Sequence, residues 1–214
     1  MRKKKRRGRS KRKKRKKKEE SNISNRKLIC GLGNPGNSFK LTRHNMGYMV
    51  IDSIVSTEGV TLKPGRSDYV FGEFTYEGTN IILVKPLKFM NLSGVPVSEA
   101  KRFFDIETDD LLIVLDDVNL PFGNIRLRKS GSDGGHKGLA SVIYHLETES
   151  FPRLRIGIGK PDDDTPLSEY VLLNFLEDEQ KQLPEIVKYS VESIKMWVSK
   201  GIEKAMNFTN KKIV

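Results

Sequence analysis

The sequence has little of several residue types that would point to particular classes of protein. It contains a single cysteine, Cys30, among 214 residues, which excludes an intramolecular disulfide and a zinc site built from several cysteines. No run approaches the roughly 18 consecutive apolar residues that a membrane-spanning helix requires. The basic start also lacks the apolar segment of a secretory signal. We therefore expect a cytoplasmic protein without membrane contact.

Positive charge is plentiful, but it is unevenly distributed. Residues 1–18 contain 15 of the 39 Lys/Arg residues and no acid, so the remainder has 24 basic residues against 27 acidic ones. Such a segment cannot bury enough apolar surface to offset the entropy of ordering, and we predict a disordered tail over residues 1–25. It would attract an RNA backbone through counterion release. A solubilising extension, a translation-start artefact or a nuclear localisation signal would have the same composition.

Residues 26–214 are long enough for one well-buried domain. Short apolar runs typical of buried strands alternate there with segments of helical spacing. The predicted strands cover residues 27–32, 69–75, 80–84, 111–115 and 153–158, and the predicted helices cover residues 46–55, 95–104, 138–146 and 178–200. Apolar strands interleaved with helices predict a single-domain, three-layer α/β sandwich, in which helices cover both faces of a mixed central sheet.

The loop after the first predicted strand matches the G-x-G-x-x-G pattern of dinucleotide-binding folds over residues 31–36. In a dinucleotide site the last glycine lies inside a helix whose N-terminus holds the pyrophosphate. Here Pro35 and Gly36 are typical of a turn, and helical spacing begins only near Asn45. These departures from a dinucleotide site argue against nucleotide binding, and we expect no cofactor.

Two of the three histidines stand in polar loops. His44 directly precedes a predicted amphipathic helix, and its place at the mouth of a loop suits either a structural role or catalysis. His136 lies among glycines. Because no second ligand stands near it at metal-binding spacing, the sequence does not predict a metal site.

Six sequence motifs follow one another in a recognisable order. They are GLGNPG (31–36), TRHNMG (42–47), KPLKFMNLSG (85–94), LDDVNLPFG (115–123), GGHKGL (134–139) and FPRLRIGIGKP (151–161). By these motifs the chain resembles the bacterial-type peptidyl-tRNA hydrolases over roughly residues 27–208. The resemblance implies a monomeric, metal-free enzyme that recycles peptidyl-tRNA by hydrolysing the ester between peptide and tRNA.

The resemblance also implies the roles of four polar residues. His44 takes the place of the general base, and Asp116 that of the carboxylate that orients it. This pair is chemically sound, because a neutral imidazole can accept a proton from water near pH 7 while a carboxylate fixes its tautomer. Asn91 would donate to the oxyanion of the tetrahedral intermediate. Asn34 would favour a substrate whose amino group is blocked.

Three further positions are implied as substrate contacts. Phe39 and Phe89 match aromatic positions of the family, although Phe39 stands where tyrosine is common, and core packing is an equally good interpretation of both. Lys137 stands where well-known members have asparagine, and its ammonium could reach a phosphate or the terminal ribose. Asn119 is a second departure, in the motif that commonly ends LDLP.

Basic residues outside the tail form two alternating pairs, Arg126 with Arg128 and Arg153 with Arg155. In a strand the members of each pair share a face. The resemblance favours Arg128 and Arg155 as tRNA contacts, whereas a solvated strand face is the simpler interpretation.

The competing function is an inactive RNA-binding factor on the same fold, of the kind that acts in splicing. The basic tail suits either function. The presence of both His44 and Asp116 favours catalysis.

Overall fold

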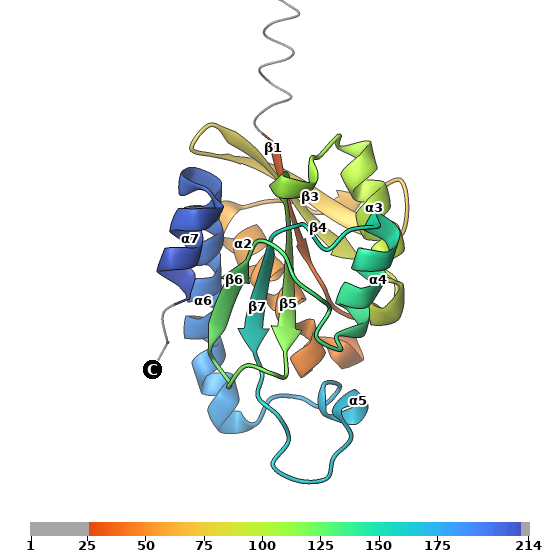
Figure 1. The fold of residues 1–214 in the computed structure, drawn as a ribbon, viewed down its shortest axis with the longest axis vertical. Coiled ribbons are helices and arrows are strands. Elements are labelled where there is room, and N and C mark those ends of the chain that lie inside the picture. The colour runs from red at the N-terminus through yellow and green to blue at the C-terminus, as the bar shows by residue number, and fades with distance from the viewer. Residues whose placement is uncertain (1–25, 211–214) are drawn as a thin grey trace, which may run out of the picture.

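The structure, a computed structural model, describes residues 26–210, and in that range seven strands form one mixed sheet (Figure 1). The tail predicted for residues 1–25 lies outside the described residues, as do residues 211–214. The order across the sheet is β2-β3-β4-β1-β5-β7-β6. The strands are β1 (Arg26–Gly31), β2 (Lys63–Pro64), β3 (Tyr69–Tyr76), β4 (Thr79–Pro86), β5 (Leu111–Asp117), β6 (Ile125–Arg128) and β7 (Arg153–Gly157).

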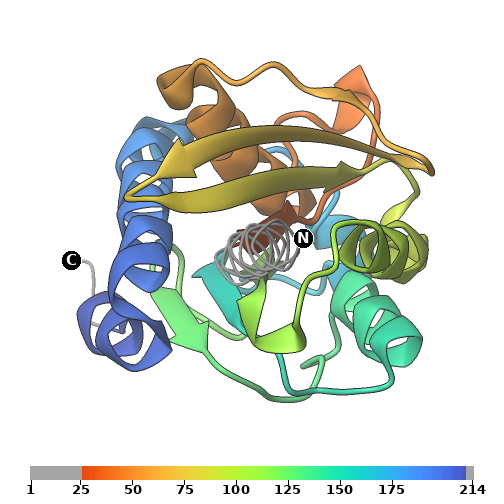
Figure 2. The same ribbon diagram turned by 90° about the horizontal axis from the view of Figure 1, so that it is seen from above.

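Helices cover both faces of this sheet. They are α2 (Met46–Glu58), α3 (Gly94–Phe103), α4 (Lys137–Leu146), α5 (Leu167–Tyr170), α6 (Glu177–Lys200) and α7 (Ile202–Thr209). Seen from above, α6 and α7 lie on one side of the molecule and α3 and α4 on the other (Figure 2). The predicted three-layer α/β sandwich is therefore confirmed.

The core is divided by the sheet into two clusters. One cluster lies between the sheet and helices α2 and α6, and it includes Val50, Ile51 and Trp197. The other lies between the sheet and helices α3 and α4, and it includes Val97 and Val142. Strand β5 is buried along its whole length, because it lies between β1 and β7 and contributes alternate side chains to each cluster. This explains why its sequence is apolar throughout rather than alternating.

Strands β1, β4, β5 and β7 run parallel, so their carboxyl ends lie at one edge of the sheet. The loops that follow β1, β4 and β5 carry the first, third and fourth motifs of the sequence. In open α/β sheets this edge is where ligands bind. The topology therefore brings residues that are far apart in the chain to one place.

The predicted elements are present, with ends that differ by a few residues. Four elements were not predicted: β2, β6, α5 and α7. Strand β2 has two residues and helix α5 has four. Strand β6 also has only four, in which arginine alternates with apolar side chains at the edge of the sheet. Helix α7 is short, and its buried face is defined by α6 and β6. Within residues 26–210 no helix is long and apolar enough to cross a membrane.

The first turn of α2 lies directly on the sheet, and two glycines make this possible. A Cβ on Gly47 would come within 2.5 Å of the backbone nitrogen and oxygen of Leu32 and would also meet the carbonyl oxygen of Val114. A Cβ on Gly31 would meet the carbonyl oxygen of Gly47. Because α2 begins right after His44, this contact sets how close that histidine comes to the end of β5.

We predict that Gly47→Ala lowers the free energy of unfolding by about 1–3 kcal/mol, because the added methyl group forces α2 away from β1 and β5. Chemical denaturation measures this loss. Ser56→Ala, at an exposed position of the same helix, is the matched control and should leave stability within about 0.5 kcal/mol. Equal stability of the two variants would show that α2 does not depend on this close approach.

Candidate active site

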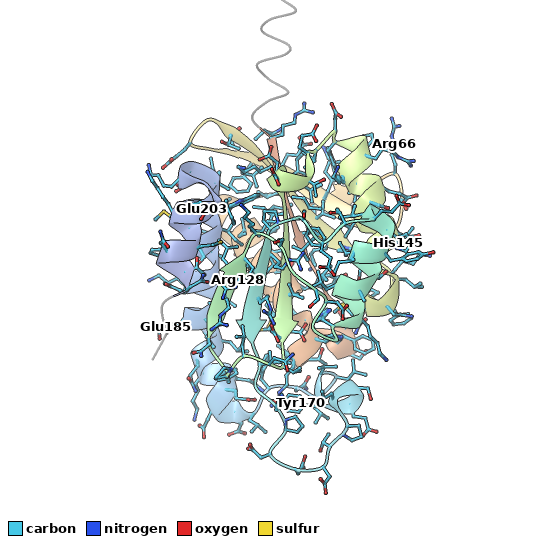
Figure 3. The ribbon with its side chains drawn as sticks, in the orientation of Figure 1. Arg66, Arg128, His145, Tyr170, Glu185 and Glu203 are labelled. Carbon is cyan, nitrogen blue, oxygen red and sulfur yellow. The ribbon has the colours of Figure 1, made fainter. Side chains whose placement is uncertain are left out.

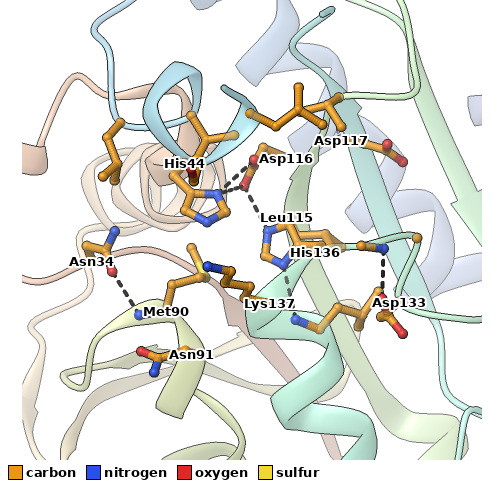
Figure 4. Close-up of a pocket in the computed structure, with 18 of the residues that line it drawn as sticks. Asn34, His44, Met90, Asn91, Leu115, Asp116, Asp117, Asp133, His136 and Lys137 are labelled. Atoms are coloured by element: carbon orange, nitrogen blue, oxygen red, sulfur yellow. Dashed lines mark hydrogen bonds and ion pairs between the residues drawn. The ribbon is translucent and has the colours of Figure 1, made fainter. Parts of the chain in front are cut away.

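Three side chains from three different segments meet at the carboxyl end of β5 (Figure 4). Asp116, the second-last residue of β5, is 1% exposed. The Nδ1 atom of His44 lies 2.9 and 3.0 Å from its two carboxylate oxygens. The Nε2 atom of His136 lies 3.0 Å from the Oδ1 atom of the same carboxylate. One buried carboxylate therefore binds two imidazoles.

The hydrogen bonds determine which ring nitrogen carries each proton. The Nδ1 atom of His136 accepts a hydrogen bond from the backbone N–H of Leu139 at 3.1 Å. Its proton is therefore on Nε2, which donates to Asp116. His44 points Nδ1 at the carboxylate and donates from that atom. No residue within 26–210 bonds its Nε2 lone pair, which lies on the side of the pocket toward Met90 and Lys137 (Figure 4).

The charge of Asp116 is held by these two partners. Burial by itself raises the pKa of a carboxyl group, but the charges of His44 and His136 and their hydrogen bonds outweigh it, so the pKa of Asp116 lies well below its ordinary value. The group is therefore an anion throughout the neutral range. It can stabilise an imidazolium on His44 without itself taking up the proton.

His44 is held in place by backbone contacts with a distant loop. Its N–H donates to the carbonyl of Val171 at 2.8 Å, and the N–H of Arg43 donates to that of Leu173 at 3.0 Å. The buried guanidinium of Arg43 pairs with Glu179 at 2.6 Å and lies over the ring of Tyr170. These contacts join the start of α2 to the segment around α5.

Asn34 is oriented by three hydrogen bonds. Its Oδ1 atom accepts from the backbone N–H of Met90 at 2.8 Å. Its backbone N–H donates to the side chain of Asn45 at 2.8 Å, and Asn45 donates back to the carbonyl of Asn34 at 3.0 Å. The bond to Met90 fixes the orientation of the amide, whose Nδ2 group can then donate to a bound molecule.

A pocket of about 580 Å³ surrounds these residues. Among the residues that line it are eight of the nine predicted site residues: Asn34, Phe39, His44, Phe89, Asn91, Asp116, Lys137 and Arg155. Phe39 and Phe89 meet edge to face, with 6.2 Å between ring centres. Phe89 is 58% exposed, which excludes its interpretation as core packing. Phe39 also lines the pocket and belongs to neither core cluster.

Arg128, the ninth predicted residue, does not line the pocket, but it shares a sheet face with Arg155. In the antiparallel pair of β6 and β7, Arg126 lies beside Arg155 and Arg128 beside Arg153. All four therefore project from one face, as the alternation predicted. Arg155 forms an ion pair with Asp117. Arg153, by contrast, is 1% exposed and cannot reach an RNA molecule. It was not among the predicted tRNA contacts, which are Arg128 (labelled in Figure 3) and Arg155.

His136 has neighbours that its spacing in the sequence does not reveal. It has two companions at close range, Asp116 and His44, whose ring centre lies 4.8 Å from its own. The possible ligand atoms of the three residues are spread over as much as 4.8 Å. Two ligands of one zinc ion, each about 2.1 Å from it, can be at most about 4.2 Å apart. The geometry therefore fits two hydrogen bonds to a carboxylate better than metal coordination.

His136 and Asn45 were not predicted as site residues from the sequence. His136 lies in the GGHKGL motif and Asn45 in the TRHNMG motif, so the motifs contained both, but neither side chain has a role that spacing reveals. Their roles depend on contacts across 20 and 11 positions of the chain. Such contacts become visible only in the folded protein.

Comparison with known proteins yields consistent similarities. The family described as peptidyl-tRNA hydrolase matches residues 28–214. Peptidyl-tRNA hydrolase of Brevibacillus brevis is 41% identical over 86% of this chain and 97% of that protein, and that of Bacillus subtilis is 40% identical over 87% and 99%. The crystal structure of peptidyl-tRNA hydrolase from Acinetobacter baumannii superposes with a TM-score of 0.82 at 34% identity, covering 87% of this chain and 95% of that one.

We predict that Asp116→Asn removes a pH-dependent part of the stability. The folded carboxyl group has a lowered pKa, whereas the unfolded one titrates near about 3.9, so the ionised group stabilises the fold above that pH. The stability advantage of the unaltered protein over the variant should therefore be greatest above about pH 5 and shrink as the pH falls toward 3. Urea denaturation of both proteins at a series of pH values measures it. A difference that does not vary with pH would contradict the assignment.

Proposed function

Because the chain belongs to the peptidyl-tRNA hydrolase family, we propose that the pocket at the end of β5 is its active site and that His44 is the general base. The protein is an enzyme that hydrolyses the ester bond between a peptide and tRNA. The observation that carries the assignment is the hydrogen bond from His44 to the buried Asp116, which leaves the other ring nitrogen free in the pocket. No cofactor enters the proposed reaction.

The proposed reaction is a direct attack by water. The Nε2 atom of His44 removes a proton as the water oxygen bonds to the ester carbonyl carbon, and the carbonyl oxygen becomes negative. The bond from this carbon to the ribose oxygen then breaks, and the imidazolium returns the proton to that oxygen. The products are a peptide acid and a tRNA with a free ribose hydroxyl. Asp116 stabilises the imidazolium between the two steps.

Two residues opposite His44 suit the negative charge of the tetrahedral intermediate. Asn91 lines the pocket, and its amide can donate a hydrogen bond to the oxyanion. Lys137 extends into the same region of the pocket, and among the described residues no carboxylate pairs with it. Its ammonium would add positive charge near the intermediate or the terminal phosphate. This charge would replace a neutral amide contact at that position in other family members.

Asn34 suits recognition of a blocked amino group. Its Nδ2 donor can bond the carbonyl oxygen of the amide that blocks the amino group of the esterified residue. Free aminoacyl-tRNA has an ammonium at this place, which cannot accept a hydrogen bond. The aromatic pair Phe39 and Phe89 offers apolar surface for the peptide or the terminal base.

The RNA part of the substrate would bind outside the pocket. Arg155 at the pocket and Arg128 beyond it lie on one sheet face, which gives a path of positive charge for phosphates. The Lys/Arg-rich residues 1–18 would add attraction to the RNA backbone that does not depend on sequence. We also propose that the protein works as a monomer, since one chain supplies every residue named for the reaction. We propose the cytoplasm as the place where it acts.

His44→Ala should lower the release of an N-blocked amino acid from tRNA by at least about 10²-fold, because it removes the base. Binding of uncharged tRNA should remain close to that of the unaltered protein. The assay is run in EDTA, with unblocked aminoacyl-tRNA as the control substrate. If the variant turns over normally, His44 is not the base. If the unaltered protein binds RNA but cuts neither substrate, it is an RNA-binding factor.

Arg128→Ala should weaken tRNA binding and flatten the slope of log affinity against log salt concentration by about 0.7–0.9, because each phosphate contact releases counterions. The ester-cleavage rate at saturating substrate should be unchanged. Arg102→Ala, which removes an exposed arginine on α3, is the matched control and should leave the slope as it was. Equal slopes for all three proteins would exclude Arg128 as a phosphate contact.

A further inference from the structure

Arg153 is a buried charge whose partners are backbone carbonyl groups. It is 1% exposed, and within residues 26–210 no carboxylate oxygen lies within salt-bridge distance of it. Its guanidinium donates to the carbonyl oxygens of Gly131, Ser132 at 3.3 Å, Glu149 at 2.7 Å and Phe151 at 3.2 Å. An arginine that fills its donors in this way holds several turns of backbone together.

The side chain remains a cation in spite of its burial. Burial lowers the pKa of Arg153 to about 10, and the nearby charge of Glu149 opposes that shift. The group is therefore protonated at neutral pH. Its charge-assisted hydrogen bonds are stronger than those that a neutral donor would make to the same carbonyls.

Two of these carbonyls belong to the segment of residues 129–136, which joins β6 to α4 and ends at His136. This segment is rich in glycine, and Gly131, Gly134 and Gly135 have φ values of 145°, 60° and 86°. Glycine loses more backbone entropy on ordering than other residues do. The segment therefore needs bonds from outside to hold one conformation. Arg153 supplies such bonds at its start, and Asn119 donates to the carbonyl of Gly134 at 3.2 Å.

Further hydrogen bonds connect this anchored segment to His136. The N–H of His136 donates to the carbonyl of Asp133 at 3.0 Å, and the Asp133 side chain accepts from Gly135 at 2.7 Å. The ring of His136 then reaches Asp116 at 3.0 Å. Arg153 does not line the pocket, so its effect on the reaction would have to pass through this segment.

We propose that Arg153 is a positioning residue for the hydrolysis: it fixes the glycine-rich segment so that His136 donates to Asp116. This inference rests on the proposed function of the His44 and Asp116 pair. Without the bond from His136, the carboxylate holds the proton of His44 more strongly. Turnover then falls, and its acidic limb moves to higher pH.

A kinetic double-mutant cycle tests this role. His136→Ala alone should lower kcat by about tenfold, and Arg153→Met alone should lower it by a similar factor with little change in KM. Combining the two should cost less than about twofold beyond either one, because both break the same bond. Both single variants should move the acidic limb of the pH–rate profile in the same direction. The proposal is wrong if the double variant lowers kcat by the product of the two single-variant factors, or if Arg153→Met has an unaltered kcat.

Two control variants distinguish a positioning role of Arg153 from a purely structural one. Ile194→Ala, in the core cluster on the other face of the sheet, should lower the melting temperature without moving the pH profile. Arg153→Lys keeps the charge but cannot fork to four carbonyls, so its kcat should lie between those of the unaltered protein and Arg153→Met. If Arg153→Met does not fold, Arg153→Lys takes its place in the cycle.

A readout that does not depend on turnover separates this proposal from the proposed function. In ¹⁵N-labelled protein, the Nε2–H signal of His136 should show a hydrogen bond, and this signal should be lost in Arg153→Met and kept in Ile194→Ala. If His44→Ala still cleaves the substrate, the proposed general base is wrong. If His44→Ala is inactive while the His136 signal survives in Arg153→Met, only the role of Arg153 is wrong.

Discussion

The site depends on a single buried negative charge. Asp116 lies at the end of a strand that is covered on both faces, where an unpaired carboxylate would be very unfavourable. His44 comes from the α2 side of the sheet and His136 from the start of α4, on the other side, and both donate to it. The charge is thus the point at which the two helical layers meet. Its need for partners helps to fix the positions of the two loops that carry these histidines.

Each of these loops is held in turn by a buried arginine that bonds to backbone carbonyls. Arg43 donates to the carbonyls of Leu173 and Asn174, which places the α5 segment beside His44. Arg153 does the same for the segment that leads to His136. In both cases a rigid, planar cation satisfies several carbonyl groups that a loop leaves without partners.

The fold could be predicted from the sequence because its strands and helices are long and strongly patterned. Residues 111–115 are apolar throughout, which predicted a strand covered on both faces, and β5 is one. Short elements such as β6 were missed, since an alternation of only four residues is too short to distinguish a strand from a loop. Of the nine predicted site residues, eight line one pocket, and they were chosen from motifs rather than from spacing. The roles of His136, Asn45 and Arg153 could not be predicted, because each is defined by a partner that only the topology brings near.

In the proposed mechanism, the hydrogen bonds that Asp116 accepts from two histidines also affect which substrates the pocket can bind. A free ammonium beside the ester would seek an anion. Three carboxylates line the pocket: Asp133, which accepts from the N–H of Gly135, Asp117, which pairs with Arg155, and Asp116, which is the most deeply buried of the three. Both of its partners are N–H donors already in place, so an ammonium could bind there only by displacing an imidazole that the reaction needs. The amide oxygen of Asn34 is turned toward the N–H of Met90, so the group that Asn34 offers to a bound molecule is its Nδ2 donor, which an ammonium cannot bond. The pocket would therefore reject free aminoacyl-tRNA because its acceptors are already used, a discrimination that requires no steric block.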